Sequence, residues 1–484
     1  MPESRVTTRL SPDDNDPLSI HPPIFETSEE RAARLASEQH AKEVSDNIDE
    51  ELEQQRVLEG KGPKPIKILL LGQSESGKST TLKNFQLMYD PKAFREERAS
   101  WRAVIQLNIV QSIRTILLAL ARLETVQSQH TSSSSSLSPK RSHPLLSPEL
   151  LTIKSRLQPL ADVEQNLVRR LTGSGDGSSQ RSGYGVTSDT TSTKGALKEI
   201  AINAAIPWKN AFSRLRKSEE RSSQDDSDGI DWEDPDDPWP ILNTCAPDMI
   251  ALWNNPNIKQ LLVRQNLRIE DLSGYFLDSL ERLTAPRYVP TDDDILHARL
   301  KTLGVSEYIF KISTSGTVRD WKVYDVGGHR SQVTAWAPYF DDMDAIIFLA
   351  PISCFDQVLE EDHKVNRLED SFKLWTLIVS NELLKNTNLI LFLNKIDILR
   401  TKLSSGVLMK DYVVSYGDRP NDVDHTAAYL RRKFGGILHE RSPSTRVFYC
   451  HFTTVTDTKS TKLILTNLKD MLMRQNLLKT NLIN

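Results

Sequence analysis

One stretch of sequence decides the fold: Leu69-Leu70-Leu71-Gly72-Gln73-Ser74-Glu75-Ser76-Gly77-Lys78-Ser79-Thr80. The mostly apolar run from Ile66 to Leu71 is typical of a buried parallel strand, and Gly-x-x-x-x-Gly-Lys-Ser follows it at once. A helix-compatible segment, Thr80 to Leu87, comes next. Strand, glycine loop and helix form the context that a phosphate-binding loop requires. Both flanks disfavour the alternative, which is a chance match to the bare pattern.

The residue types of this loop suit a triphosphate. Gly72 and Gly77 let the backbone bend so that successive N–H groups point at phosphate oxygens. The N-terminus of the following helix adds a partial positive charge. Lys78 is expected to reach the β- and γ-phosphates, and the Ser79 hydroxyl is expected to ligate Mg²⁺. The loop predicts a nucleoside triphosphate without identifying the base.

Composition bounds the class of protein. A chain of 484 residues is too long for one ordinary core, and a mean hydropathy of −0.43 predicts sizeable unpacked segments. The net charge of −4, without a sustained basic stripe, argues against a nucleic-acid partner. Three cysteines without close pairing (Cys245, Cys354 and Cys450) predict a reducing, intracellular compartment. We expect neither a signal peptide nor a membrane-spanning segment.

The N-terminal part of the chain changes character twice. Residues 1–27 are rich in Pro, Asp and Ser and are expected to be disordered. Residues 28–62 are rich in Glu, Ala, Arg, Lys and Gln with sparse apolar positions, which predicts a long helix. That helix is either a partner-binding element or a solvated extension, and the residues alone leave both open.

A helical domain is predicted over residues 92–294. Trp101 to Leu123 has strong helical periodicity and is apolar on more than one side, so it should be the central helix of a bundle. A sequence pattern typical of helices resumes at about Cys245 and continues to Leu283. Residues from about 128 to 240 are dominated by Ser, Gly, Thr and acidic runs, which predicts a mostly flexible low-complexity insertion.

The remaining residues, 63–91 and 295–484, alternate between strand and helix patterns. A hairpin is predicted from Tyr308 to Val326, and a final amphipathic helix from Lys459 to Leu482. Buried parallel strands are predicted at Ala345–Ala350, Leu389–Leu393 and Val447–Phe452. This pattern predicts a doubly wound α/β domain that the helical domain interrupts.

Two further motifs select the ion and the base. Asp325 ends a predicted strand just before Gly327 and Gly328, where it can hold Mg²⁺ through water while the Gly328 N–H meets a γ-phosphate. Asn394-Lys395-Ile396-Asp397 ends another strand. Asp397 can accept both hydrogen bonds from guanine N1 and its exocyclic amine, a pair that adenine cannot make. Lys395 supplies an aliphatic stem over the base. These motifs predict a GTP site and disfavour a nucleotide kinase.

With these motifs in place, the chain resembles a divergent, fungal-like heterotrimeric G-protein alpha subunit over residues 28–484, apart from the insertion. The residues that carry the resemblance are Gly72 to Thr80, Asp294 to Thr302, Asp325 to Arg330, Asn394 to Asp397 and Phe452 to Thr458. The resemblance implies a Ras-like P-loop GTPase domain with an inserted all-helical domain. It also implies an N-terminal helix that binds the βγ dimer and a C-terminal helix read by seven-transmembrane receptors.

The resemblance further assigns roles by position. Arg299 matches the arginine that stabilises the transferring phosphate, Glu75 the glutamate that pairs with it, and Thr302 the threonine that ligates Mg²⁺ beside Ser79 and Asp325. Val455 matches an alanine in the loop around the guanine, so its extra methyl groups are expected to crowd the base. The other nucleotide-binding residues implied are Ser76, Thr80, Asp271, Leu296 and His297.

His329 is a departure from the family pattern. It stands where the family has the glutamine that orients the attacking water, so we expect slow hydrolysis with Arg299, His329 and Glu75 as the catalytic residues. The competing interpretation is a nucleotide-gated scaffold with little or no GTPase activity.

Lipid anchoring is a second departure. Pro2 occupies the position where myristoylation requires glycine, and no cysteine is near the N-terminus. We therefore expect a cytoplasmic protein that is peripheral at the inner face of the plasma membrane through its partners. The receptor and the effector are not identified by the sequence.

Overall fold

The fold was analysed in a computed structural model, which describes residues 27–61, 64–131, 147–172, 186–188, 200–203, 230–265, 267–271, 274–303, 305–314, 317–340, 342–359 and 361–479. The chain divides into two compact units, Met1–Lys64 and Pro65–Asn484. Predictions for residues 1–26, for most of the low-complexity insertion and for the last five residues lie outside the described residues.

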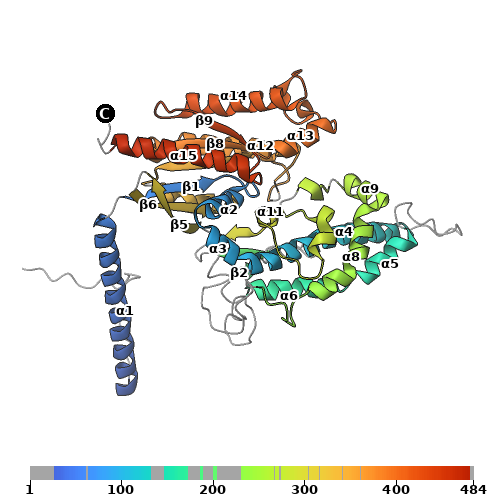
Figure 1. Cartoon of the computed structure of the whole chain (residues 1–484), viewed down its shortest axis with the longest axis horizontal. Helices are drawn as coiled ribbons and strands as arrows, with labels where there is room; N and C mark the ends of the chain where they lie inside the picture. The colour runs from blue at the N-terminus through green and yellow to red at the C-terminus, as the bar shows by residue number, and fades with distance from the viewer. Residues whose placement is uncertain are drawn as a thin grey trace, which may run out of the picture. The chain divides into compact units, whose positions relative to one another are not determined.

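In the first unit, residues 28–61 form the predicted helix, α1 (Ser28–Lys61) (Figure 1). Its apolar side chains Leu35, Val44 and Ile48 are all more than two-fifths exposed.

The second unit contains a six-stranded sheet of strand order β5-β6-β1-β7-β8-β9. Its strands are β1 (Ile66–Leu71), β5 (Val305–Thr314), β6 (Thr317–Val326), β7 (Ala345–Pro351), β8 (Asn388–Asn394) and β9 (Tyr449–Thr453). Neighbouring strands run parallel from β6 to β9, and β5 forms an antiparallel hairpin with β6. The predicted hairpin and parallel strands are confirmed, and β1 lies at the centre, directly before the glycine loop.

Apolar side chains cover both faces of this sheet. Along β1, Leu69 and Leu71 pack on one face, whereas Ile68 and Leu70 pack on the other, as the two-residue period of a strand requires. The first face is covered by η3 (Arg330–Tyr339), η4 (Ile352–Cys354), α12 (Arg367–Val379), α13 (Ile396–Ser404) and α14 (Val423–Arg441). The second is covered by α2 (Lys78–Tyr89) and α15 (Thr458–Lys479). The short turns η5 (Glu382–Leu384), η6 (Met409–Asp411) and η7 (Val414–Tyr416) complete this part of the chain.

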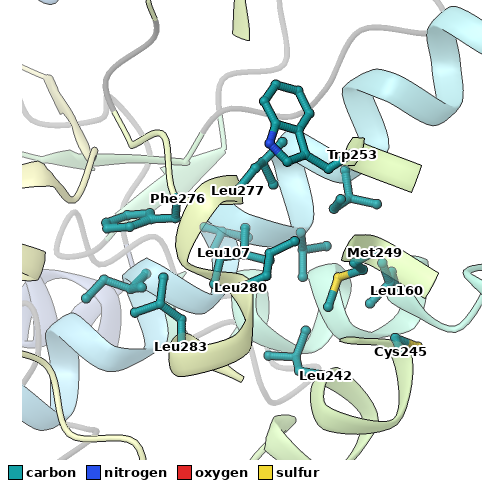
Figure 2. Close-up of a cluster of buried hydrophobic side chains, with 14 of the residues drawn as sticks. Leu107, Leu160, Leu242, Cys245, Met249, Trp253, Phe276, Leu277, Leu280 and Leu283 are labelled. Atoms are coloured by element: carbon teal, nitrogen blue, oxygen red, sulfur yellow. The ribbon is translucent and has the colours of Figure 1, made fainter. Parts of the chain in front are cut away.

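A separate hydrophobic core joins the helices between β1 and β5. They are α3 (Pro91–Glu96), α4 (Arg98–Thr131), α5 (Pro148–Arg156), α6 (Leu160–Thr172), α8 (Trp239–Asn254), α9 (Pro256–Arg264), η1 (Ile269–Asp271), η2 (Leu277–Ser279), α10 (Leu280–Leu283) and α11 (Asp292–His297). Figure 2 shows Leu107 of α4 among side chains from α6, α8 and the residues around η2, including Leu160, Met249 and Leu280. The central position predicted for the helix around Trp101–Leu123 is confirmed.

Helix α4 is unusually long and apolar for a helix of this protein. Residues Arg98–Thr125 are long and apolar enough to cross a membrane, with a hydropathy of 1.6 over the best window. That window is 67% buried inside the protein. A helix surrounded by other helices must be apolar on every side, so its position in the core accounts for its composition.

The structure differs from the sequence prediction at residues 147–172. This range lies inside the predicted low-complexity insertion of 128–240, yet it forms α5 and α6, and Leu150, Leu160 and Leu167 are buried in the helical core. The predicted bounds of the insertion are therefore wrong here, because two short apolar segments lie between a Ser-rich and a Gly/Ser-rich stretch whose composition dominates the range. A small sheet of β2 (Val186–Ser188), β3 (Ile200–Asn203) and β4 (Lys301–Leu303) was also not predicted.

Candidate functional site

The glycine loop lies at the carboxyl end of β1 and leads directly into α2. Gly72 and Gly77 have φ values of 141° and 105°, which side chains other than hydrogen rarely allow. A Cβ atom on Gly77 would lie 2.4 Å from the Asn394 side-chain nitrogen, and one on Gly72 would lie 2.3 Å from the Leu349 carbonyl oxygen. Both glycines are therefore required for the loop to approach its neighbours. The helix begins at Lys78, two residues before the predicted start.

A pocket opens over this loop. Its walls are formed by loop residues 74–80, by Lys83 of α2, by Ala298, Arg299 and Leu300 after α11, and by Val326, Gly328 and His329 after β6. The structure thus brings the loop together with two segments that follow it by more than two hundred residues in sequence. Eight of the predicted nucleotide residues line this pocket: the six from Glu75 to Thr80, together with Arg299 and Gly328.

Two buried lysines give the pocket its positive side. Lys78 donates hydrogen bonds from Nζ to the Gly72 and Gln73 carbonyls at 2.8 and 2.7 Å. Burial lowers its pKa to about 8, against the opposing effect of Asp325. Lys83 donates to the Ile295 and Ala298 carbonyls, both at 2.8 Å, and burial lowers its pKa to about 7. Bound phosphates would favour the charged form of both groups.

Ser79 and Asp325 meet at the end of the loop. The Ser79 hydroxyl donates to Asp325 Oδ2 at 2.8 Å, and Asp325 is fully buried at the end of β6. A hydroxyl and a carboxylate are hard oxygen ligands of the kind that Mg²⁺ takes. Thr302, the third predicted ligand, is in β4, where its backbone pairs with Ile202 of β3. Its side chain is not among those described.

Glu75 links two arginines beside the pocket. Its Oε1 lies 2.6 Å from Arg299 Nη1, and its Oε2 lies 3.1 Å from Arg367 Nη1. Burial of Glu75 would raise its pKa, but Arg299 and Arg367 hold the pKa at about 2. Arg367 also donates to the Ser74 carbonyl at 2.8 Å. Glu75 is therefore a stable anion that holds Arg299 at the loop.

The backbone of Arg299 is hydrogen-bonded to a residue of the helical core. Asn108 of α4 accepts from the Arg299 N–H at 2.8 Å and donates to the Arg299 carbonyl at 3.0 Å. A Cβ atom on Gly274 would lie 2.9 Å from both residues, so this glycine permits the contact. Sequence analysis missed Asn108, although an asparagine inside a strongly apolar helical stretch is a signal for such a role.

A second missed group begins at the loop residue Gln73. Its side-chain nitrogen donates to the Arg367 carbonyl at 2.6 Å and to Asp370 Oδ2 at 2.7 Å. Asp370 Oδ1 accepts from Arg330, whose Nη2 lies 3.1 Å away. The loop is thus tied to the start of α12 and to the residue after His329. Nothing in the sequence spacing indicates that these residues meet.

The residues predicted to read guanine surround the far end of the loop. Asn394 donates to the Ser76 carbonyl at 2.7 Å, and its oxygen accepts from Thr453 Oγ1 at 3.0 Å and from the Val455 N–H at 3.2 Å. Asp397 is exposed, with Thr454 Oγ1 donating to it at 3.1 Å. Lys395 has a left-handed φ of 64°. Asn394 therefore joins the phosphate loop to the loop that contains Val455.

Three predicted residues lie differently from the rest. Leu296 is buried in α11, and its carbonyl is 3.4 Å from Thr80 Oγ1. The His297 ring faces the Asp293 carbonyl of its own helix at 2.9 Å. Neither residue lines the pocket. Asp271 ends η1, and its side chain is not described.

Comparison with known proteins agrees with this geometry. The sequence pattern of the G-protein alpha subunit family matches residues 42–472. The chain belongs to the G-protein alpha subunit family. It is 33% identical to the guanine nucleotide-binding protein alpha-4 subunit of Mycosarcoma maydis, over 99% of this chain and 97% of that protein. It is 29% identical to a guanine nucleotide-binding protein alpha subunit of Candida albicans, over 91% and 95% of the two chains.

The family explains the arrangement as a whole. Alpha subunits are guanine nucleotide-binding signalling proteins and in general GTPases, and this chain is a divergent, fungal-like member. The Ras-like sheet and the helical core together form the two-part architecture that was predicted.

Proposed function

We propose that this alpha subunit is a GTP-hydrolysing switch that couples seven-transmembrane receptors to effectors. The observation that carries the proposal is the position of Arg299, which lines the loop's pocket and is held 2.6 Å from Glu75. An arginine supplied within the same chain can stabilise negative charge on the transferring γ-phosphate.

Mg²⁺ fits the residues present. Ser79, Asp325 and Thr302 would hold the ion, and the bound ion would neutralise charge on the β- and γ-phosphate oxygens. Among the described residues no group of three or more His, Cys, Asp or Glu side chains could hold a metal. That agrees with Mg²⁺, which typically uses one or two carboxylates together with waters and substrate phosphates.

Partners follow from the proposed switch. The βγ dimer would bind α1, whose exposed Leu35, Val44 and Ile48 would then be covered. Receptor-driven exchange would load GTP, and ordering around Thr302 and Gly328 would release βγ and expose an effector surface. We place the protein at the inner face of the plasma membrane through these partners.

Purified protein tests the proposal directly. We expect saturable GTP binding that requires Mg²⁺, and phosphate release over many turnovers. The scaffold alternative, with little or no GTPase activity, predicts GTP binding without phosphate release. Loss of all binding would overturn both interpretations.

His329→Gln tests the expected slow hydrolysis. Restoring an amide with donor and acceptor in the longer side chain should raise the single-turnover rate about tenfold or more. GTP affinity should change little, because residue 329 contributes to orienting water. An unchanged rate would show that His329 is not what limits hydrolysis.

A further inference from the structure

His329 has a partner in the structure that no sequence pattern indicates. Its Nε2 lies 3.2 Å from Oε1 of Glu361, and the two side chains are 33% and 17% exposed. His329 lines the phosphate pocket, and Glu361 lines the adjoining hollow that also contains Ser74, Glu75 and Gly328. The Glu361 carboxylate therefore contacts the imidazole next to the phosphate loop.

The segment that presents Glu361 is closed at its base. Residues 357–359 and 361–366 lie between η4 and α12. Leu359 N–H donates to the Val365 carbonyl at 3.0 Å, and Arg367 N–H donates to the Gln357 carbonyl at 2.9 Å. The side chain of Asn366 donates to the Phe355 carbonyl at 2.6 Å. A base held by these three bonds limits where the tip, with Glu361, can lie.

The charged residues next to His329 and Glu361 form a second contact of their own. Arg330, the residue after His329, directs its guanidinium to Asp370 at 3.1 Å and to Asp362 at 3.6 Å. Two adjacent acids, Glu361 and Asp362, thus face two adjacent basic residues, each acid facing a different one. These two pairs fix how residues 329–330, after β6, lie against residues 361–362, before α12.

A carboxylate at Nε2 has a defined chemical consequence. In neutral imidazole one nitrogen donates and the other accepts, and a carboxylate accepting from Nε2–H makes Nδ1 the accepting nitrogen. Because His329 lines the phosphate pocket, an accepting nitrogen of its ring can take a hydrogen bond from a water molecule there. In the family pattern, the glutamine at the position of His329 supplies this hydrogen-bond acceptor.

We propose that Glu361 is a positioning residue that fixes the tautomer and orientation of His329, so that Nδ1 orients the attacking water. This inference rests on the proposed GTPase function. It assigns the water-orienting role to a His–Glu pair rather than to a single side chain. A single partly exposed contact of this kind contributes little to stability, so its effect should appear in hydrolysis and not in folding.

The test is single-turnover hydrolysis of preloaded GTP by the full chain. Glu361→Ala should lower the rate about tenfold, whereas Glu361→Gln, whose amide oxygen still accepts from Nε2–H, should stay within about twofold of the wild type. Both substitutions should change the rate less than twofold in a His329→Gln background, because residue 329 is then no longer an imidazole. GTP affinity should be unchanged throughout. Glu382→Ala, an exposed carboxylate on η5, is the matched control.

Three results would overturn the inference. They are an unchanged rate in Glu361→Ala, an equal loss in Glu361→Gln, or the same tenfold loss in the His329→Gln background, which would indicate a general structural role. Failure of the proposed function is distinguishable, since the wild-type protein itself would then release no phosphate.

Discussion

At the scale of single residues, ion pairing and hydrogen bonds decide where the Arg299 guanidinium lies in the pocket. Arg299 is held by Glu75 through its side chain and by Asn108 through its backbone, so the guanidinium is positioned before any phosphate binds. Preorganised charge of this kind requires little rearrangement during reaction.

Arg299→Ala tests that role. Loss of the guanidinium should lower the single-turnover hydrolysis rate by about 10³-fold, within the range known for such arginines, with GTP affinity nearly unchanged. Rapid-quench measurement of phosphate is the readout. Arg299→Lys, which keeps one positive charge but not the planar fork, should recover only a small part of the rate. A rate within twofold of wild type in Arg299→Ala would contradict the assignment.

Asp397→Asn tests the guanine assignment. The carboxylate accepts two hydrogen bonds from guanine, whereas an amide donates to a base that has a carbonyl at position 2. GTP affinity should therefore fall about 10³-fold and xanthosine triphosphate affinity should rise, as titration with both nucleotides would show. Asp424→Asn, an exposed carboxylate on α14, is the control. An Asp397→Asn protein with the same GTP affinity as the wild type would refute the assignment of Asp397 to guanine recognition.

At the scale of secondary-structure elements, one short helix delivers Arg299 to the pocket. α11 begins with a capping box in which Thr291 and Asp294 satisfy each other's backbone N–H groups. Asp294 also accepts from both terminal nitrogens of Arg282, at 2.8 and 2.6 Å, and from the Tyr288 hydroxyl at 2.9 Å. A helix of this length is stable only with such contacts.

The same contacts predict a pH dependence of stability. Burial alone would raise the pKa of Asp294, but hydrogen bonds from Arg282, Thr291 and Tyr288 hold the pKa at about 2. A carboxyl whose folded pKa lies below its usual value contributes stability above about pH 4, and this is lost as pH falls toward 2. We expect about 2 kcal/mol from this source, present at pH 7 and absent near pH 2.

Urea unfolding of the wild type and Asp294→Asn between pH 2 and 7 measures this contribution. The difference in free energy of unfolding between the two proteins should shrink below about pH 4. A difference that stays constant across this range would show that Asp294 does not contribute through its charge.

Other elements show which patterns carry information. The apolar strands β1, β7 and β8 and the all-round apolar helix α4 follow from the sequence, because burial on both faces leaves a continuous apolar run. α5 and α6 were missed, since Ser- and Gly-rich flanks outweighed two short apolar segments in the composition of the whole range. The ends of β9 differ from the prediction by one or two residues, and α15 begins one residue before its predicted start.

At the scale of the whole second unit, the helical core and the sheet are joined by a charged contact distant from the phosphate loop. Arg268, before η1, pairs with Asp356, whose other oxygen accepts from Lys402 of α13 at 2.8 Å. The Asp356 side chain is fully buried. Because the nucleotide would lie between the two cores, this contact should slow its release.

Arg268→Ala should therefore raise the GDP dissociation rate about fivefold, since truncating one partner of a buried charged pair acts mainly on dissociation. Release of a fluorescent GDP analogue in excess unlabelled nucleotide is the measurement. Arg264→Ala, an exposed arginine four residues earlier, should leave the rate unchanged. A wild-type rate in Arg268→Ala would show that the contact does not restrain release.

The amino-acid sequence alone was enough to predict the local chemistry of this protein: the phosphate loop, the acid at the end of β6, the Asn-Lys-x-Asp run and the alternation of strands and helices. Each of these is encoded in residues that are neighbours along the chain. Tertiary structure alone decided that Arg367 shares Glu75 with Arg299, that Asn108 holds Arg299, and that Glu361 meets His329. These pairs join residues that are tens to hundreds of positions apart. They come together only because the carboxyl ends of parallel strands meet at one edge of the sheet, where the helical core also contacts it.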